Sequence, residues 1–197
     1  KLLAIASKNL DKLNKFKKDL EVNNEYCFNN YQTLIECKEI DIIYIALPTS
    51  LHHQWIIKCL DEGKKVLVEK PATMNAAEIE EIKNKYPKEK IFINEAFMYM
   101  HYPQTKKIIE LINKGEIGEL ISMESNFGNN ILTKKNFFGF EKIKKLNTKN
   151  RIFNKELGGG VILDLGCYPV SLSTLIASQI IKIDYRKIKM INIEKYM

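Results

Sequence analysis

The sequence predicts an α/β protein with a doubly wound parallel sheet, followed by the beginning of a second unit of different texture. Through the first hundred residues, short apolar runs alternate with amphipathic stretches of helical period. Strands and helices that alternate at this spacing are joined by right-handed crossovers and form a parallel sheet. The regular alternation stops near Pro103. We therefore place a domain boundary near Phe97 and expect one unit at 1–97 and another at 98–197.

The elements of the first unit follow from periodicity and end signals. The expected strands cover 2–6, 25–28, 41–46, 65–69 and 91–94, and the expected helices cover 9–21, 31–37, 51–62 and a segment from residue 75 onward. Gly63 is a good C-terminal cap for the third helix. Asn75 with Glu78 three residues later has the pattern of a capping box. The run 41–46 is continuously apolar, which is typical of a strand in a sheet covered on both faces.

In the second unit we expect fewer and less regular elements. A helix over 103–114 should stop at Gly115, and 118–127 alternates like a half-buried strand. Three consecutive glycines, Gly158 to Gly160, lead into an apolar helix over 161–176, and a further strand is expected near 180–185.

The net charge of +7 is concentrated in one segment. Residues Lys134 to Lys155 include eight basic residues and one acid, which accounts for the whole excess. This segment could bind nucleic acid, with Phe137, Phe138 and Phe140 as stacking residues. Specific nucleic-acid contacts usually use arginine forks, however, and all but one of the basic residues in this segment are lysines. We therefore expect no nucleic-acid partner and keep this function as an alternative.

Several other classes are disfavoured by composition. The four cysteines form no CxxC pair and have no clustered histidines, so we expect no metal site and no disulfide framework, and a reduced, cytoplasmic protein. No signal peptide is apparent, and no run approaches the roughly 20 apolar residues of a membrane span. The chain starts at Lys1 rather than at a methionine, so we expect it to be a piece of a longer protein.

Polar residues and prolines follow the predicted strands, where ligands bind in sheets of this kind. These segments are Ser7-Lys8, Leu47-Pro48-Thr49-Ser50, Glu69-Lys70-Pro71 and Glu95-Ala96-Phe97. His52 opens the helix that follows the second of them. We therefore expect the chemistry of the protein at this edge of the sheet.

Four motifs in register carry a family resemblance. They are DIIYIALPTSLH at 41–52, VLVEKP at 66–71, NEAFMY at 94–99 and ELGGGVILDLGCYP at 156–169. In this order and spacing the chain resembles the Gfo/Idh/MocA oxidoreductases from about Leu3 to about Leu175. The resemblance is to the branch that contains glucose–fructose oxidoreductase, dimeric dihydrodiol dehydrogenase and NADP-dependent xylose dehydrogenases. It implies an N-terminal Rossmann domain and a C-terminal α+β domain with a large open sheet, through which full-length members form homo-oligomers.

The resemblance also implies a reaction and its residues. The reaction is hydride transfer between a nicotinamide cofactor and a CH–OH group of a sugar or cyclic diol. Lys70 would lie beside the nicotinamide and the substrate hydroxyl, Asp164 would orient the substrate, and Tyr168 would exchange the proton. The implied cofactor-binding residues are Ser7, Lys8, Leu47, Pro48, Thr49, His52, Glu69, Lys70, Pro71, Glu95 and Arg151, of which Arg151 could instead meet the substrate or be a loop arginine. Pro71 could follow a cis peptide bond.

Elementary chemistry supports the same three residues. Asp164 and Tyr168 are four apart on a predicted helix, so they face the same way. A free tyrosine has a pKa of about 10, and an ammonium group such as that of Lys70 beside it would lower this pKa. Ser7-Lys8 replaces the acid that NAD enzymes usually carry after this strand and is similar to the Ser-Arg pair of NADP-using relatives. We expect NADP as the cofactor, with NAD possible.

The chain departs from the family pattern at three places. It contains no Gly-x-Gly-x-x-Gly, and the resemblance places that loop, with the first strand of the sheet, before residue 2. The similarity fades after about Ile176. Met100 stands where many relatives have arginine. We therefore expect a partial Rossmann sheet without its first strand, in either a fragment or a decayed copy, and keep a non-catalytic relative that acts as a binding protein as the alternative.

Overall fold

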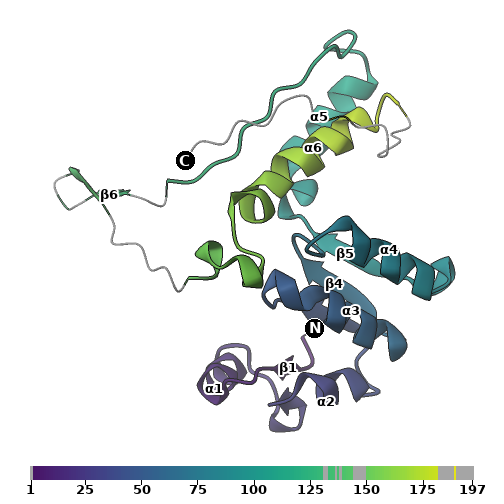
Figure 1. Ribbon diagram of the computed structural model, residues 1–197, viewed down its shortest axis with the longest axis vertical. Coiled ribbons are helices and arrows are strands. Elements are labelled where there is room, and N and C mark those ends of the chain that lie inside the picture. Colours follow the sequence, from purple (N-terminus) through teal and green to yellow (C-terminus); the bar gives the residue numbers. More distant parts are fainter. Residues whose placement is uncertain are drawn as a thin grey trace.

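The computed structural model describes residues 2–130, 133–135, 137, 139–143, 150–181 and 189 (Figure 1). The strands are β1 (Ile5–Ala6), β2 (Cys27–Phe28), β3 (Ile42–Ile45), β4 (Lys65–Glu69), β5 (Ile93–Ala96), β6 (Thr133–Lys135) and β7 (Glu141–Ile143). The helices are α1 (Leu10–Asp19), α2 (Tyr31–Glu36), α3 (His52–Asp61), α4 (Ala76–Lys85), α5 (Pro103–Asn113) and α6 (Cys167–Ala177). The predicted alternation of strand and helix up to β5 is confirmed. β1, β2 and β3 are shorter than expected, β4 has the expected bounds, and β5 lies two residues later than expected.

The strands of the first part pair in parallel, but in two separate groups. β1 pairs with β2, and β3, β4 and β5 form a second sheet in that order. In the second sheet Tyr44 lies opposite Leu67, and Leu67 lies opposite Asn94. The parallel α/β class is therefore confirmed. Among the described strands, neither β1 nor β2 pairs with β3.

The main core lies between the β3–β4–β5 sheet and the helices on one of its faces. Ile56 and Cys59 of α3 are fully buried and belong to the same cluster as Ile43, Val66 and Ile82. Burying such side chains stabilises the fold by about 1.5–3 kcal/mol each. This layer holds the strand ends in place.

The opposite face of this sheet is open within the described residues. Ile42 is 57% exposed and Tyr44 is 54% exposed, whereas Ile43 and Ile45 are buried. Burial therefore alternates along β3, and the expectation of a strand covered on both faces is wrong for the described chain. The side chains of β3 are apolar on both faces of the sheet, but described helices cover only one face.

Side-chain caps set the helix ends that the sequence predicts. The Asn75 side chain accepts a hydrogen bond from the Glu78 amide, and the Glu78 carboxylate accepts one from the Met74 amide. This arrangement starts α4 and confirms the role of this pair in capping. Gly63 follows α3 with a φ of +68°, as expected for a C-terminal glycine.

The second part of the chain differs from the prediction at 118–127. This segment is not a strand, and Ile121 on it is 92% exposed. Its residues alternate as in a strand, but a strand needs a neighbour for its backbone groups, and no described residue supplies one. The predicted strand is therefore wrong for the described chain. Of the strand expected near 180–185, Ile180 and Ile181 lie in a turn and the remainder lies outside the described residues.

The expected helix over 161–176 begins as a π-helical turn, Ile162–Gly166, and continues as α6. The helical stretch Lys155–Ala177 has 23 residues and contains an 18-residue window with a mean hydropathy of 1.5, so by length and composition alone it could cross a membrane. The expectation that no segment reaches this length is wrong. One such helix is a weak indication, because apolar helices of water-soluble domains meet the same criteria.

The basic segment is only partly described. β6 and β7 pair antiparallel. Phe137 and Phe140 lie between these two strands in the sequence and are exposed. Phe138 and residues 144–149 lie outside the described residues. The alternative of nucleic-acid binding is not tested by this geometry.

Candidate active site

The predicted residues after β3, β4 and β5 lie at one edge of the sheet, because the three strands run in the same direction. β4 ends at Glu69, and the Lys70–Pro71 peptide bond that follows is cis. Leu47, Pro48 and Thr49 follow β3, and Thr49 is buried. Parallel pairing thus gathers the three central segments that the sequence analysis identifies.

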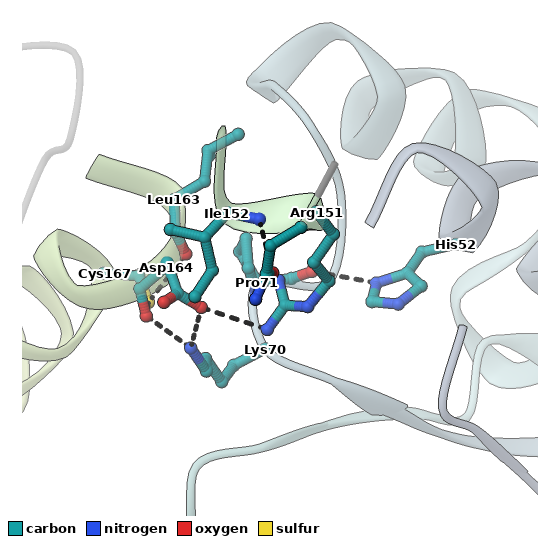
Figure 2. Close-up of polar contacts among 9 residues, drawn as sticks. His52, Lys70, Pro71, Arg151, Ile152, Leu163, Asp164 and Cys167 are labelled. Atoms are coloured by element: carbon teal, nitrogen blue, oxygen red, sulfur yellow. Dashed lines mark hydrogen bonds and ion pairs between the residues drawn. The ribbon is translucent and has the colours of Figure 1, made fainter. Parts of the chain in front are cut away.

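Lys70 meets the residues that come from the far end of the sequence (Figure 2). Its Nζ donates a hydrogen bond to the Asp164 backbone oxygen and lies 3.4 Å from Asp164 Oδ1. The same Nζ lies 4.9 Å from the centre of the Tyr168 ring. Only 13% of the Lys70 side chain and 16% of the Asp164 side chain are exposed. Asp164 and Tyr168 therefore do face the same way, although the helix between them starts as a π turn.

Arg151 approaches the same carboxylate from the other side. Its Nη2 lies 3.2 Å from Asp164 Oδ1, so one carboxylate oxygen contacts two cations (Figure 2). About half of the Arg151 side chain is exposed. In the described structure Arg151 is therefore a partner of Asp164.

The glycine run brings the two parts of the site together. Gly158 is buried and has a φ of +79°. A Cβ on Gly158 would lie 2.7 Å from Thr49 Cβ and 2.8 Å from Met74 Sδ. Real Cβ atoms do not approach this closely, so only glycine fits here. The close packing of the loop before Asp164 on the segment after β3 explains how Asp164 reaches Lys70.

Tyr168 does not have the lowered pKa that we expected from Lys70. Burial is the main cause that raises the pKa of Tyr168 above its ordinary value, and the nearby Cys167 and Glu69 raise it further. The ammonium of Lys70 lies 4.9 Å from the centre of the ring. The expectation is wrong because burial and the neighbouring acidic groups raise the pKa of Tyr168.

Tyr168 is held by other aromatic side chains. Phe97, Tyr99 and Phe127 lie with their ring centres 5.4, 6.3 and 4.8 Å from the centre of the Tyr168 ring. Its hydroxyl has no hydrogen-bond partner within the part of the chain that the structure describes. A cavity of about 460 Å³ adjoins this cluster and is lined by Glu95, Phe97, Met100 and Cys167 among others.

His52 and Glu95 contact the segment after Lys70. His52 is buried, and its ring nitrogens lie 3.0 Å from the Pro71 oxygen and 2.8 Å from the Leu47 oxygen. The Glu95 Oε1 accepts a hydrogen bond of 2.7 Å from the Ala72 amide. Burial raises the pKa of Glu95. Both side chains contact protein backbone, and their binding of the cofactor stays a prediction.

Ser7 and Lys8 belong to the other group of strands, so the structure does not bring them to Lys70. Ser7 Oγ accepts a hydrogen bond of 3.2 Å from the Asn9 amide. Lys8 Nζ lies 5.6 Å from the centre of the Tyr31 ring, in an exposed position. The sequence predicts these two residues for the opposite end of the dinucleotide, and they remain predictions for that role.

Tyr44 is a residue of the site that the sequence analysis misses. Its hydroxyl donates a hydrogen bond to the Glu69 carboxylate, the residue before Lys70. Burial, followed by this hydrogen bond, raises the pKa of Tyr44 to about 12. Because Tyr44 lies opposite Leu67 in the parallel pair, it shares a face with Glu69 two residues further on. The strand register would have indicated this pair, but apolar patterning alone could not.

A parallel sheet with a lysine, a carboxylate and a tyrosine at its carboxyl edge fits the nucleotide-binding oxidoreductases. Residues 1–96 match the model for an oxidoreductase family with an NAD-binding Rossmann fold, and residues 105–187 match that for the GFO/IDH/MocA C-terminal domain. The chain belongs to the Gfo/Idh/MocA family, as its motifs predict.

Curated relatives and solved structures agree with this assignment. The chain is 31% identical over 175 residues to trans-1,2-dihydrobenzene-1,2-diol dehydrogenase of Xenopus tropicalis. The matched region covers 89% of the chain and 48% of the relative. It is 31% identical to D-xylose 1-dehydrogenase (NADP(+)) 2 of Haloferax volcanii, over 87% of the chain and 48% of that relative. The chain thus spans about half the length of the curated relatives that it matches.

Among solved structures, KijD10, a 3-ketoreductase of Actinomadura kijaniata in complex with NADP and TDP-benzene, matches with a TM-score of 0.67 and 25% identity. The match covers 90% of the chain and 49% of KijD10. The aldose-aldose oxidoreductase of Caulobacter crescentus matches with a TM-score of 0.70 at 18% identity, over 90% of the chain and 50% of that enzyme, and supports the fold alone.

Proposed function

We propose that the protein is an NADP-dependent oxidoreductase that transfers a hydride between the nicotinamide and a CH–OH or C=O group of a sugar or cyclic diol. The observation that carries this proposal is the meeting of Lys70, Asp164 and Tyr168 after the end of β4. Lys70 and Asp164 are 94 positions apart in the sequence, yet their side chains are in contact and mostly buried. Similarity to a diol dehydrogenase and a xylose dehydrogenase supports the substrate class.

Each residue has a distinct part in this chemistry. A nicotinamide bound at this edge of the sheet would supply or accept the hydride. The Lys70 ammonium stabilises the negative charge that develops on the substrate oxygen, since a fixed cation in a buried site needs little reorganisation. Asp164 holds Lys70 through its carboxylate and its backbone oxygen. The Tyr168 hydroxyl exchanges the proton with the substrate oxygen.

The protonation state of Tyr168 suits the reductive direction. A tyrosine carries its proton at neutral pH, and the raised pKa of Tyr168 keeps it in that form. It can therefore donate that proton to the oxygen of a carbonyl as the carbon receives the hydride. In the oxidative direction the tyrosine must first lose its proton, so oxidation should increase as the pH rises.

The residues present fit the two ends of the cofactor. Lys8 is an exposed cation after β1, at the point where NAD enzymes usually have an acid, and it would pair with a 2′-phosphate. Lys70 and the segment Leu47 to Thr49 would face the nicotinamide end. The described site offers no observation in favour of a non-catalytic relative, because the three residues proposed to react lie together.

The test of this proposal is a titration of the chain with NADPH and with NADH, followed by nicotinamide fluorescence. Lys8→Glu should weaken NADPH binding by about tenfold or more, since charged hydrogen bonds contribute about 1.5–3 kcal/mol, and should leave NADH binding nearly unchanged. Lys12→Glu, an exposed lysine of α1, is the matched charge control. An equal loss for both cofactors would contradict the preference for NADP.

The same titration should be run on the chain preceded by a strand and glycine-rich loop taken from a relative. In Rossmann domains the amides of that loop hold the pyrophosphate. Binding that appears only in the extended chain would support the proposal. No binding of either cofactor to either form would contradict it.

We propose a cytoplasmic location and, for the full-length protein, a homo-oligomer formed through the second domain. The four cysteines are free thiols in the described structure, as in a reducing compartment. Apolar side chains such as Val161, Ile162 and Val170 are exposed on the helical stretch before and within α6, where further protein would cover them. Analytical ultracentrifugation of the longest form that the gene encodes tests the oligomer.

A further inference from the structure

We propose that His52 and Glu95 are positioning residues, which hold the Pro71–Ala72 peptide group from its two sides and thereby keep Lys70 at Asp164. This inference rests on the proposed function, because the importance of Lys70 depends on it. It assigns to His52 and Glu95 a role in shaping the site rather than in contacting the cofactor.

The two contacts fall on the same peptide group. A ring nitrogen of His52 lies 3.0 Å from the Pro71 oxygen, and Glu95 Oε1 accepts a hydrogen bond of 2.7 Å from the Ala72 amide. That oxygen and that N–H belong to one planar peptide unit and point in opposite directions when it is trans. Only the Lys70–Pro71 bond is cis among the described residues, so this unit is trans. A rotation of this peptide would break both contacts at once.

His52 also connects this peptide to the end of β3. Its second ring nitrogen lies 2.8 Å from the Leu47 oxygen. Both neighbours are carbonyl oxygens, which only accept hydrogen bonds, whereas a neutral imidazole carries a single N–H and a protonated one carries two. The buried carboxylate of Glu95 lies close enough to His52 for the two to interact electrostatically. His52 therefore bridges the peptide after Lys70 and the end of β3.

The connection to Lys70 is short. The held peptide group begins one residue after Lys70, whose Nζ reaches the backbone oxygen and Oδ1 of Asp164. Lys70 therefore sits between two anchors, the peptide after it and the carboxylate in front of it. If the first anchor is lost, the ammonium can leave Asp164 and become accessible to solvent.

The experiment measures the accessibility of Lys70 without cofactor or substrate. The chain is treated briefly with an acetylating reagent, and the modified fraction of Lys70 is measured by mass spectrometry relative to that of the exposed Lys12. His52→Ala and Glu95→Leu should each raise this ratio by roughly fivefold, the factor that corresponds to a hydrogen bond worth about 1 kcal/mol. Glu95→Gln retains an acceptor oxygen for the Ala72 amide and should stay near the wild-type ratio.

His53→Ala is the matched control for His52→Ala. It removes the neighbouring ring of α3, which contacts Glu81 and not the segment after Lys70, and it should leave the ratio unchanged. Circular dichroism establishes whether each variant is folded. If His52→Ala fails to fold, the comparison of Glu95→Leu with Glu95→Gln decides.

The proposal is overturned if Glu95→Leu and Glu95→Gln give the same ratio, or if lysines throughout the chain become equally accessible in the variants. It is also overturned if His53→Ala raises the ratio as much as His52→Ala. Failure of the proposed function would appear elsewhere, as an absence of NADPH binding in the fluorescence titration with Lys70 still protected.

Discussion

Replacing Gly158 with alanine should destabilise the chain more than the same change at any open positive-φ glycine. Two costs combine at this position. An L-residue with a φ near +79° costs about 1–2 kcal/mol. A methyl group 2.7 Å from Thr49 Cβ and 2.8 Å from Met74 Sδ adds the cost of overpacking, about 1–3 kcal/mol. The sum is a loss of about 2–5 kcal/mol.

Gly63→Ala is the control for this prediction. Gly63 has a φ of +68° and no atom within 4 Å of the position that a Cβ would take. It therefore carries the backbone cost without the clash, and the effect of alanine on the unfolded chain is the same in both variants. The difference between the two variants should be about 1–3 kcal/mol, which is the overpacking cost alone.

The assay is urea unfolding followed by circular dichroism, in which a shift of the midpoint at constant slope measures the change in the free energy of unfolding. Gly158→Ala should also release Lys70, because the displaced loop carries Asp164. Equal destabilisation by Gly158→Ala and Gly63→Ala would refute the close approach of this loop to Thr49. It would also remove the explanation of how the two parts of the site meet.

Three further predictions concern single side chains. Tyr44 should ionise at about pH 12 in an ultraviolet titration, and Glu69→Gln should move this titration towards the ordinary value. Since the pKa of Tyr44 is higher in the folded chain than in the unfolded chain, its contribution to stability is complete below about pH 10 and is lost as the pH approaches 12. Cys59 is fully buried and burial raises its pKa to about 12, so it should react with a thiol reagent only after unfolding by urea, whereas reaction in the native state would contradict its burial. Tyr168→Phe should lower kcat for carbonyl reduction by about 10²–10⁴, and an unchanged kcat would remove Tyr168 from proton transfer.

Much of the fold could be predicted because its signals are local. Asn75 and Gly63 mark helix ends through their own backbone and side chain, and both act where the sequence predicts. The parallel direction of β3, β4 and β5 follows from the helical connections between them. The prediction of a strand over 118–127 is wrong for the opposite reason. The alternation of its residues is local, but a strand exists only when another segment pairs with it.

The site could be predicted in its residues but not in its contacts. Motif spacing identifies Lys70, Asp164 and Tyr168, and the structure brings them together. The pKa of Tyr168 could not be predicted, because it depends on where the ammonium lies relative to the ring and how deeply the ring is buried. The Tyr44–Glu69 hydrogen bond depends on strand register, which apolar patterning does not reveal.

The arrangement around Asp164 has an electrostatic consequence for the proposed reaction. One carboxylate oxygen contacts both Lys70 and Arg151, so the group of three carries a net positive charge. A group with a net positive charge and a mostly buried lysine favours a negative charge on an oxygen that comes beside that lysine. The alkoxide that forms during hydride transfer is such a charge. Asp164 therefore does not cancel the cation that the reaction needs; it holds Lys70 in place while Arg151 offsets the charge of the carboxylate.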